Sequence, residues 1–254
     1  MSILRVFHDG AVAPAGETWT LGRDEARHLV RVRRARPGDT VEVLNGRGHR
    51  AVATLVAAAG HAATLRTDSV RAEPAVAPRI HLCLALAKAK AFELAVQKAA
   101  ELGVASVIPV ATENCDVGLF GARAIAKVDK WRSIAVESLK QCGNSWLPHI
   151  VVPVPFVDAL ARARSAPGLR IIAALHPRAE PLGTVLAREN PTEATVFIGP
   201  EGDFTPAEYE NAFAAGCVPV TLAETVLRVE TAAVAALSVL VQYRLSTSAG
   251  IEAT

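Results

Sequence analysis

The chain has 254 residues, of which 51% are hydrophobic and 20% charged, and its formal net charge is +2. This length suits one large or two modest domains, and the composition supplies enough apolar side chains for a packed core, which argues against a disordered chain. No apolar run reaches the roughly 20 residues that a membrane-spanning helix needs, and the first residues lack the apolar segment of a secretory signal. We therefore expect a cytoplasmic protein.

The cysteines and histidines do not form a recognisable metal-binding pattern. The four cysteines, Cys83, Cys115, Cys142 and Cys217, are widely spaced and form no CxxC pair, and the seven histidines form no HExxH pattern. Structural zinc sites and disulfide frameworks both require closely patterned ligands. We expect neither a metal site nor a disulfide framework.

Residues 1–72 are expected to form a small β-rich domain. Short apolar stretches at residues 41–44, 51–55 and 62–65 predict strands, which turn signals separate. One turn is Pro37-Gly38-Asp39, and the other, Asn45-Gly46, is typical of a tight hairpin whose two central residues both have positive φ. The spacing of these strands fits a small barrel or sandwich.

Charge is distributed unevenly between this region and the rest of the chain. Residues 1–72 contain 11 arginines and 7 acidic residues, a net charge of +4, whereas residues 73–254 carry a net charge of −2. A basic excess at one end of a chain is typical of a module that binds a polyanion.

A proline-containing linker at residues 73–78 leads to residues 79–250, where the sequence pattern changes. Strands and helices alternate there, which predicts an α/β domain with a mostly parallel sheet. The predicted strands span residues 80–86, 106–110, 169–175, 194–198 and 218–222, and the predicted helices span residues 92–102, 122–142, 182–189, 206–215 and 230–245.

The most informative segment follows the predicted strand at residues 194–198. A glycine-rich loop, residues 199–204 (GPEGDF), leads into a helix whose start is marked by Thr205, Pro206 and Glu208. In open α/β sheets, ligands bind at this kind of strand-to-helix loop. The loop lacks the lysine of a phosphate-binding loop and carries Glu201 and Asp203, so it suits a ligand with some positive charge. The alternative is a tight connection that binds no ligand.

A second loop of interest, residues 225–229, precedes the last helix. Arg228 lies in this loop beside an apolar helix, and Glu230 and Thr231 begin that helix. An acidic residue at a helix N-terminus is favourable because of the helix dipole, so Glu230 and Thr231 are open to a simple capping role as well as a functional one.

Together these segments resemble the RsmE-type small-subunit ribosomal RNA uridine N3-methyltransferases of the SPOUT class. The matching segments, in chain order, are RHLVRVRRARPGD with NGRG, KAKAFELAVQKAAELGV with IPV, ESLKQCGNSWLP, FIGPEGDFTPAE and LAETVLRVETA. The chain departs from the family pattern at three places. Asp203 replaces the usual last glycine of GPEGG, Ala223 replaces a glycine, and Cys142-Gly143-Asn144 stands where the family often has a small residue and an arginine.

The resemblance implies a fold and a ligand. It implies an N-terminal PUA-like β-barrel that binds RNA, residues 1–72, and a C-terminal SPOUT α/β domain with a deep trefoil knot, residues 79–250. It also implies a homodimer with the active site near the subunit interface, and S-adenosyl-L-methionine as cofactor. The implied cofactor-binding residues are Leu175, His176, Pro177, Ile198, Gly199, Pro200, Glu201, Gly202, Leu222, Val226, Leu227, Arg228, Thr231 and Ala232.

The implied reaction is methylation of N3 of a specific uridine in 16S ribosomal RNA of the small ribosomal subunit. Arg228 is the candidate for stabilising negative charge on the base, and Glu230 is a weaker candidate as general base or as the residue that orients Arg228. Two alternatives remain, a ribosome assembly factor that binds RNA without catalysis and a methyltransferase of the same fold that acts on another RNA. Candidate RNA-binding residues, which could also form a merely solvated basic face, are Arg23, Arg27, His28, Arg31, Arg33, Arg34 and Arg36.

Overall fold

The computed structural model describes residues 3–59, 61–115 and 121–251, and the contacts between residues divide the chain into two compact units. The first unit holds the described residues up to Ala75 together with Val136–Leu147, and the second holds Val76–Ala135 and the described residues from Pro148 onward. The long helix α3 (Ala122–Cys142) therefore contributes its last turns to the first unit. Nothing in the sequence pattern indicated that contribution.

A five-stranded sheet forms the first unit, in the order β1-β3-β4-β5-β2. Strand β1 pairs with β3 in parallel, and the other neighbours are antiparallel. Alternate residues of β3 and β4 point into a core that includes Val41, Val43 and Leu55, as expected of a sheet with one buried face. The strands are β1 (Leu4–Phe7), β2 (Thr18–Thr20), β3 (Thr40–Leu44), β4 (His49–Ala59) and β5 (Ala62–Ala72).

The predicted β-rich character of this unit is confirmed, but the expected turn geometry at Asn45-Gly46 is wrong. A four-residue connection joins β3 to β4, and Gly46 and Gly48 have positive φ whereas Asn45 does not. The Asn45 side chain is buried, and its Oδ1 accepts hydrogen bonds from the backbone N–H groups of Arg47 and His49. The asparagine therefore holds the turn through its side chain rather than through a left-handed backbone.

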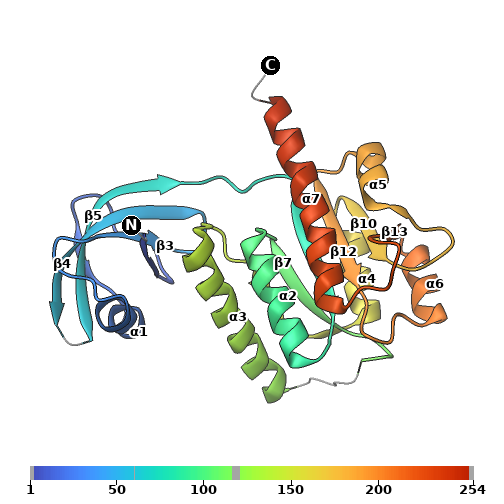
Figure 1. The fold of residues 1–254 in the computed structure, drawn as a ribbon, viewed down its shortest axis with the longest axis horizontal. Helices are drawn as coiled ribbons and strands as arrows, with labels where there is room; N and C mark the ends of the chain where they lie inside the picture. Colours follow the sequence, from blue (N-terminus) through green and yellow to red (C-terminus); the bar gives the residue numbers. More distant parts are fainter. Residues whose placement is uncertain (1–2, 60, 116–120, 252–254) are drawn as a thin grey trace. The chain divides into compact units, whose positions relative to one another are not determined.

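The second unit is built on a predominantly parallel sheet in the order β11-β13-β10-β12-β6-β7-β8, with β9 paired to β7. Figure 1 labels β7, β10, β12 and β13 of this sheet. All neighbouring strands of this sheet, among the described residues, pair in parallel, which confirms the predicted α/β character. The strands are β6 (Arg79–Ala85), β7 (Ser106–Ala111), β8 (His149–Ile150), β9 (Val154–Pro155), β10 (Leu169–Ala173), β11 (Glu180–Pro181), β12 (Glu193–Ile198) and β13 (Val218–Thr221).

Helices cover both faces of this sheet. Helices α2 and α7 lie side by side on one face, and α4 and α6 pack together on the other (Figure 1). On the second face, Phe156 of α4 contacts Phe197 of β12 and Phe204, with ring centroids 5.8 and 5.1 Å apart. The helices of this unit, besides α3, are α2 (Ala89–Glu101), α4 (Phe156–Ser165), α5 (Leu182–Glu189), α6 (Pro206–Ala214) and α7 (Val229–Ile251).

Several elements differ from the sequence prediction, among them three in the second unit. Helix α4 was not predicted, although its buried residues Phe156, Ala159, Leu160 and Ala163 follow helical spacing. Strand β10 ends at Ala173, so Leu175 lies in the loop that follows rather than in the strand. Helix α7 extends beyond residue 245 to Ile251. No helix among the described residues is both long and apolar enough to span a bilayer.

Candidate active site

Three loops meet at one edge of the parallel sheet. Strand β10 lies between β12 and β13, and the chain leaves the carboxyl end of each of these strands into one of the loops that the sequence singled out. The carboxyl ends of adjacent parallel strands meet at one edge, so residues 174–179, 199–205 and 222–228 are brought together there. The first turn of α7 closes the same region, because Val229 and Ala232 line it.

These loops enclose a cavity of about 430 Å³. That volume lies within the range of small-molecule sites, about 300–1,000 Å³. Its wall is mostly apolar side chains and backbone, with charge supplied by Glu201, Asp203 and Arg228. The lining residues are Ala173, Ala174, Leu175, Ile198, Gly199, Pro200, Glu201, Asp203, Leu222, Ala223, Thr225, Val226, Leu227, Arg228, Val229 and Ala232.

Ten of the fourteen residues expected to bind the cofactor are among those lining the cavity. The structure places the other four, His176, Pro177, Gly202 and Thr231, outside this lining, and their contact with a ligand stays a prediction. The expected cofactor-binding residues did not include six of the lining residues, among them Asp203 and Thr225. The remaining four are Ala173, Ala174, Ala223 and Val229, which continue segments already singled out.

Local contacts explain why two of the four residues lie outside the lining. The His176 ring packs edge-on against Phe213 of α6, with centroids 5.3 Å apart, so this side chain is engaged on the helix. The carbonyl of Gly202 accepts a hydrogen bond from Asn114 Nδ2 at 3.1 Å, and the same amide donates to the carbonyl of Asp203 at 2.9 Å. Asn114 therefore holds the outer part of the glycine-rich loop.

Asp203, which stands where the family usually has glycine, adopts the backbone conformation of a glycine. Its φ is +60°, in the left-handed region that aspartate tolerates better than most residues. Its Oδ1 accepts hydrogen bonds from the Phe204 N–H at 2.8 Å and from the Tyr209 hydroxyl at 2.7 Å. Burial and the bond to Asp203 raise the pKa of Tyr209, which keeps this hydroxyl protonated as a donor. The substitution therefore adds a carboxylate to the cavity wall and ties it to α6.

The predicted capping box at the start of α6 is confirmed. Thr205 Oγ1 accepts a hydrogen bond from the Glu208 N–H at 3.3 Å, and Glu208 Oε2 accepts one from the Thr205 N–H at 2.9 Å. Glu208 is buried, and its Oε1 also accepts a hydrogen bond from the Glu113 N–H at 2.9 Å. One carboxylate thus joins α6 to the segment that follows β7, and so supports the loop that precedes the helix.

Replacing Glu208 by alanine is expected to lower the free energy of unfolding by about 2 kcal/mol, because two backbone N–H groups lose a charged acceptor. Urea unfolding followed by circular dichroism measures the change. Glu208→Gln is the matched control, since its single amide oxygen retains one of the two acceptor roles and gives a smaller loss. Equal stability of wild type and Glu208→Ala contradicts this account.

Arg228 and Glu230 occupy different positions relative to the cavity. Arg228 is exposed and lines the cavity, whereas Glu230 is half-buried in the first turn of α7 and is not part of the lining. Within the part of the chain that the structure describes, neither side chain forms a hydrogen bond or an ion pair. The Arg228 guanidinium is therefore available at the cavity to a ligand or substrate.

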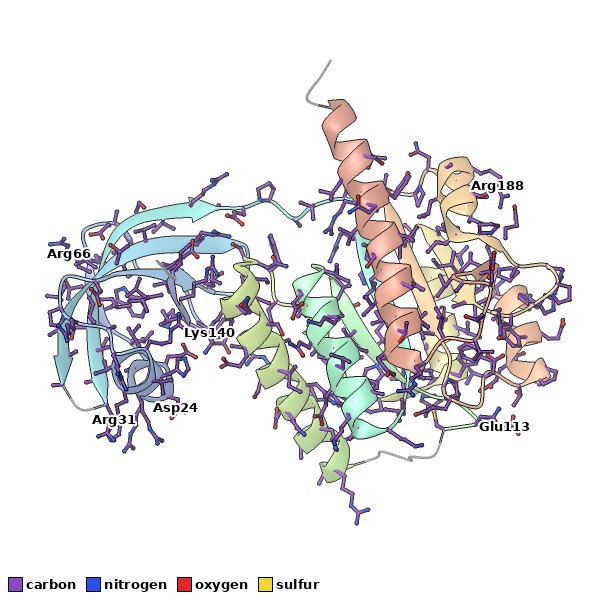
Figure 2. All side chains as sticks on the ribbon, viewed as in Figure 1. Asp24, Arg31, Arg66, Glu113, Lys140 and Arg188 are labelled. Atoms are coloured by element: carbon purple, nitrogen blue, oxygen red, sulfur yellow. The ribbon has the colours of Figure 1, made fainter. Side chains whose placement is uncertain are left out.

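The arginines expected to bind RNA lie on one short segment of the first unit. This segment runs through α1 (Arg23–Arg27) and the π-helical turn His28–Val32, which Ala26 and Leu29 anchor in the core. Figure 2 labels Asp24 of α1 and Arg31 of the π-helical turn, and both side chains are exposed. The six arginine side chains are exposed and His28 is half-buried; the arginines are Arg23, Arg27, Arg31, Arg33, Arg34 and Arg36.

Comparison with known proteins assigns this chain to a class of protein. Residues 75–241 match the model of an RNA methyltransferase domain, and residues 21–68 match that of an RNA methyltransferase PUA domain. The chain therefore has the α/β fold of an RNA methyltransferase with a PUA domain. Among the described residues, no cluster of three or more histidine, cysteine, aspartate or glutamate side chains is placed to hold a metal ion.

Individual relatives identify one family within this class. The chain is 30% identical over 241 residues to ribosomal RNA small subunit methyltransferase E of Mycobacterium bovis, covering 92% of this chain and 90% of that protein. The crystal structure of the Neisseria gonorrhoeae methyltransferase of the same name, bound to S-adenosyl methionine, has a TM-score of 0.84 and 27% identity, over 93% of this chain and 96% of that one. A putative methyltransferase from Legionella pneumophila in complex with the same cofactor has a TM-score of 0.81 and 28% identity, over 94% and 97% of the two chains. The chain belongs to the ribosomal RNA small subunit methyltransferase E family, which confirms the resemblance seen in the sequence.

Proposed function

We propose that this protein uses S-adenosyl-L-methionine to methylate N3 of a specific uridine in 16S ribosomal RNA. The observation that carries the proposal is the cavity at the carboxyl ends of β10, β12 and β13, which brings together the three loops that the family resemblance assigns to the cofactor. The names of the family members supply the substrate, small-subunit ribosomal RNA. Action on the ribosome is the basis for proposing a cytoplasmic location.

The cavity fits this cofactor in three respects. Its volume of about 430 Å³ suits a nucleoside-sized ligand. Gly199 brings backbone to the wall, and Leu222, Leu227 and Ala232 offer apolar surface to an adenosine. Glu201 and Asp203 supply negative charge for a ligand that carries a sulfonium and an ammonium group. S-adenosyl-L-methionine supplies an electrophilic methyl group when it is bound.

The chain's own residues must make N3 of uracil nucleophilic. N3 of uracil carries a proton, so it becomes nucleophilic only when that proton leaves and negative charge spreads over the flanking carbonyl oxygens. Arg228 is exposed at the cavity, where its guanidinium can hydrogen-bond to those oxygens and stabilise the uridinate. Glu230 is a weaker candidate, as general base or as the residue that orients Arg228. Base pairing hides N3, so the target must be unpaired or flipped out.

The proposal includes a barrel, a knot and a dimer. Residues 1–72 would form a PUA-like barrel that binds RNA, and residues 79–250 a SPOUT domain with a deep trefoil knot. The protein would act as a homodimer without a metal ion. Helix α7 supports the dimer, because its residues 232–241 are apolar except for Ser238 and the helix still exposes Val239 and Leu245, which favours burial against another chain. The Val226 side chain, in the loop before α7, is a second apolar group that a single protomer leaves exposed, at 81%.

RNA affinity is expected to depend on the arginines of α1 and the π-helical turn. Each side chain that binds a phosphate releases counterions, so removing one such side chain lowers the slope of log affinity against log salt by about 0.7 for single-stranded RNA. The double variant Arg27→Ala/Arg31→Ala is expected to bind RNA more weakly and to lower that slope by about 1.4. Arg164→Ala/Arg188→Ala removes the same charge from the second unit and serves as the control. Equal slopes in the two double variants contradict a role for this segment.

The proposed function is tested by calorimetry with S-adenosyl-L-methionine, followed by mass mapping of methylated nucleosides in 16S ribosomal RNA and in small subunits. One ligand bound per subunit and a single N3-methyluridine support the proposal. A different modified nucleoside identifies a methyltransferase with another RNA target. Absence of ligand binding at millimolar concentration, with and without RNA, favours an assembly factor that binds RNA without catalysis.

A further inference from the structure

Trp146 is a large aromatic side chain that the first unit exposes to solvent. Its exposed fraction is 38%, whereas Trp131 is buried and Trp19 is half-buried, with its indole N–H bonded to Thr67 Oγ1 at 3.1 Å. Trp146 belongs to the segment after α3, close to Cys142-Gly143-Asn144, where the chain departs from its family pattern. An aromatic ring at the surface of an RNA-binding unit can stack on a nucleic-acid base.

The ring is held in a fixed orientation. The indole Nε1–H donates to the Glu73 carbonyl at 3.1 Å, and the backbone N–H of Trp146 donates to Asn144 Oδ1 at 3.0 Å. The indole packs directly against Gly48, where a Cβ would lie 2.3 Å from the Trp146 Cζ2 atom. Because the ring is held at several points, little side-chain entropy is left to lose when a flat ligand stacks on its exposed surface.

The backbone around the ring is equally constrained. Arg47 and Trp146 form an antiparallel bridge, and the Gly48 N–H donates to the Ser145 carbonyl at 2.9 Å. The Leu147 N–H donates to the Gly46 carbonyl at 3.0 Å. The connection between β3 and β4 and the segment after α3 thus form one small platform, which we define as Gly46–Gly48 with Ser145–Leu147.

Positive charge lies beside this platform. Arg47 is exposed, and its ion pair with Asp9, at 3.0 Å, joins side chains that are 63% and 50% exposed. An exposed pair of this kind contributes little stability, so the guanidinium can exchange the carboxylate for a phosphate. Two further basic side chains, His49 and Arg71, are exposed at the same ends of β4 and β5. The acidic Glu73 is already engaged with Arg50, at 3.2 Å.

We propose that the platform is a binding site for an unpaired RNA nucleotide, whose base stacks on Trp146 and whose phosphate binds Arg47. The inference rests on the proposed RNA-binding function of this unit and adds a second contact surface to the arginines of α1. A fixed indole beside a weakly engaged arginine is the combination that binds single-stranded RNA, because the ring takes the base and the cation takes the backbone. Stacking of this kind does not select a particular base.

The test uses the full-length protein, a single-stranded oligouridylate and a single-stranded oligoadenylate. Binding is expected to quench tryptophan fluorescence in the wild type, and the quenching is expected to disappear in Trp146→Phe but to persist in the control Trp19→Phe. Trp146→Leu keeps an apolar side chain without a stacking face, and we expect its affinity to fall on the order of tenfold. Trp146→Phe keeps a smaller aromatic face and is expected to lose less.

Two outcomes overturn the site. One is quenching that persists in Trp146→Phe, and the other is equal RNA affinity of wild type and Trp146→Leu with both proteins folded by circular dichroism. Binding of S-adenosyl-L-methionine, measured on the same variants, separates this result from the proposed function. If these variants bind the cofactor as the wild type does, and RNA affinity still depends on Arg27 and Arg31, the methyltransferase proposal is retained. Only the Trp146 site is then contradicted.

Discussion

Arg228→Ala is expected to lower kcat by on the order of 10²- to 10³-fold at saturating RNA and cofactor, the loss typical of removing one hydrogen-bond donor to a developing anion. Arg228 lines the cavity, is exposed, and has no hydrogen bond or ion pair from its guanidinium within the described residues. Because nothing in the unit depends on that guanidinium, its removal should leave the fold intact. Steady-state transfer of a radiolabelled methyl group to 16S ribosomal RNA measures kcat, and a single-turnover experiment assigns the loss to the transfer step.

A matched variant separates charge from geometry at the same position. Arg228→Lys keeps the positive charge but loses the planar fork that can bind two oxygens of a uridinate, so partial activity is expected. Glu230→Gln tests the weaker candidate, since a general base there requires a carboxylate and an orienting residue tolerates an amide better. Wild-type kcat in Arg228→Ala at saturating RNA would show that the arginine has no catalytic role.

Two of the three loops of the site could be predicted from the residues alone, because each follows a recognisable strand and carries local signals, whereas the loop after β10 was implied only by the family resemblance. Glycine and proline after Ile198, and the capping box at Thr205, mark a turn and a helix start without reference to the rest of the fold. The parallel sheet then brings the loops together, since β10 lies between β12 and β13. Local sequence patterns therefore located two of the loops, and the family resemblance supplied the third loop and the expected cofactor-binding residues.

The long-range contacts that hold these loops could not be predicted from local sequence patterns. Asn114 lies far along the chain from Gly202 and Asp203, whose carbonyls it binds, and no local pattern links an asparagine after β7 to that loop. The Glu208 contact with Glu113 is similarly long-range. Likewise, the assignment of Val136–Leu147 to the first unit depends on tertiary contacts such as that of Trp146 with Gly48.

The shortest elements were also beyond sequence reasoning. Strand β2 has three residues and β1 four, and helix α1 has five, so hydrophobic periodicity has too few positions to indicate them. Helix α4 is a different case. Its apolar spacing was present in the sequence, but Pro155 supplies no side-chain cap to mark the start.

Gly199→Val is expected to weaken binding of S-adenosyl-L-methionine by at least about 100-fold, a loss of roughly 2.7 kcal/mol. Gly199 lines the cavity at the end of β12, and even a single Cβ there would lie 3.1 Å from the Phe204 ring and 3.4 Å from Asp203 Oδ1. Phe204 is buried against Phe156, with ring centroids 5.1 Å apart, so its ring has little room to retreat. The branched side chain must therefore displace the loop or enter the cavity, and either change opposes the ligand.

Calorimetry on the folded variant measures this loss, and Gly183→Ala is the control, because a Cβ at Gly183 in α5 meets no atom within 4 Å. The control should bind the cofactor like wild type. Wild-type affinity in Gly199→Val, with an unchanged circular dichroism spectrum, would mean that the ligand does not approach this strand end. The cavity between β10, β12 and β13 would then not be the cofactor site. Loss of binding in Gly199→Val alone ties the family's cofactor to the glycine-rich loop of this chain.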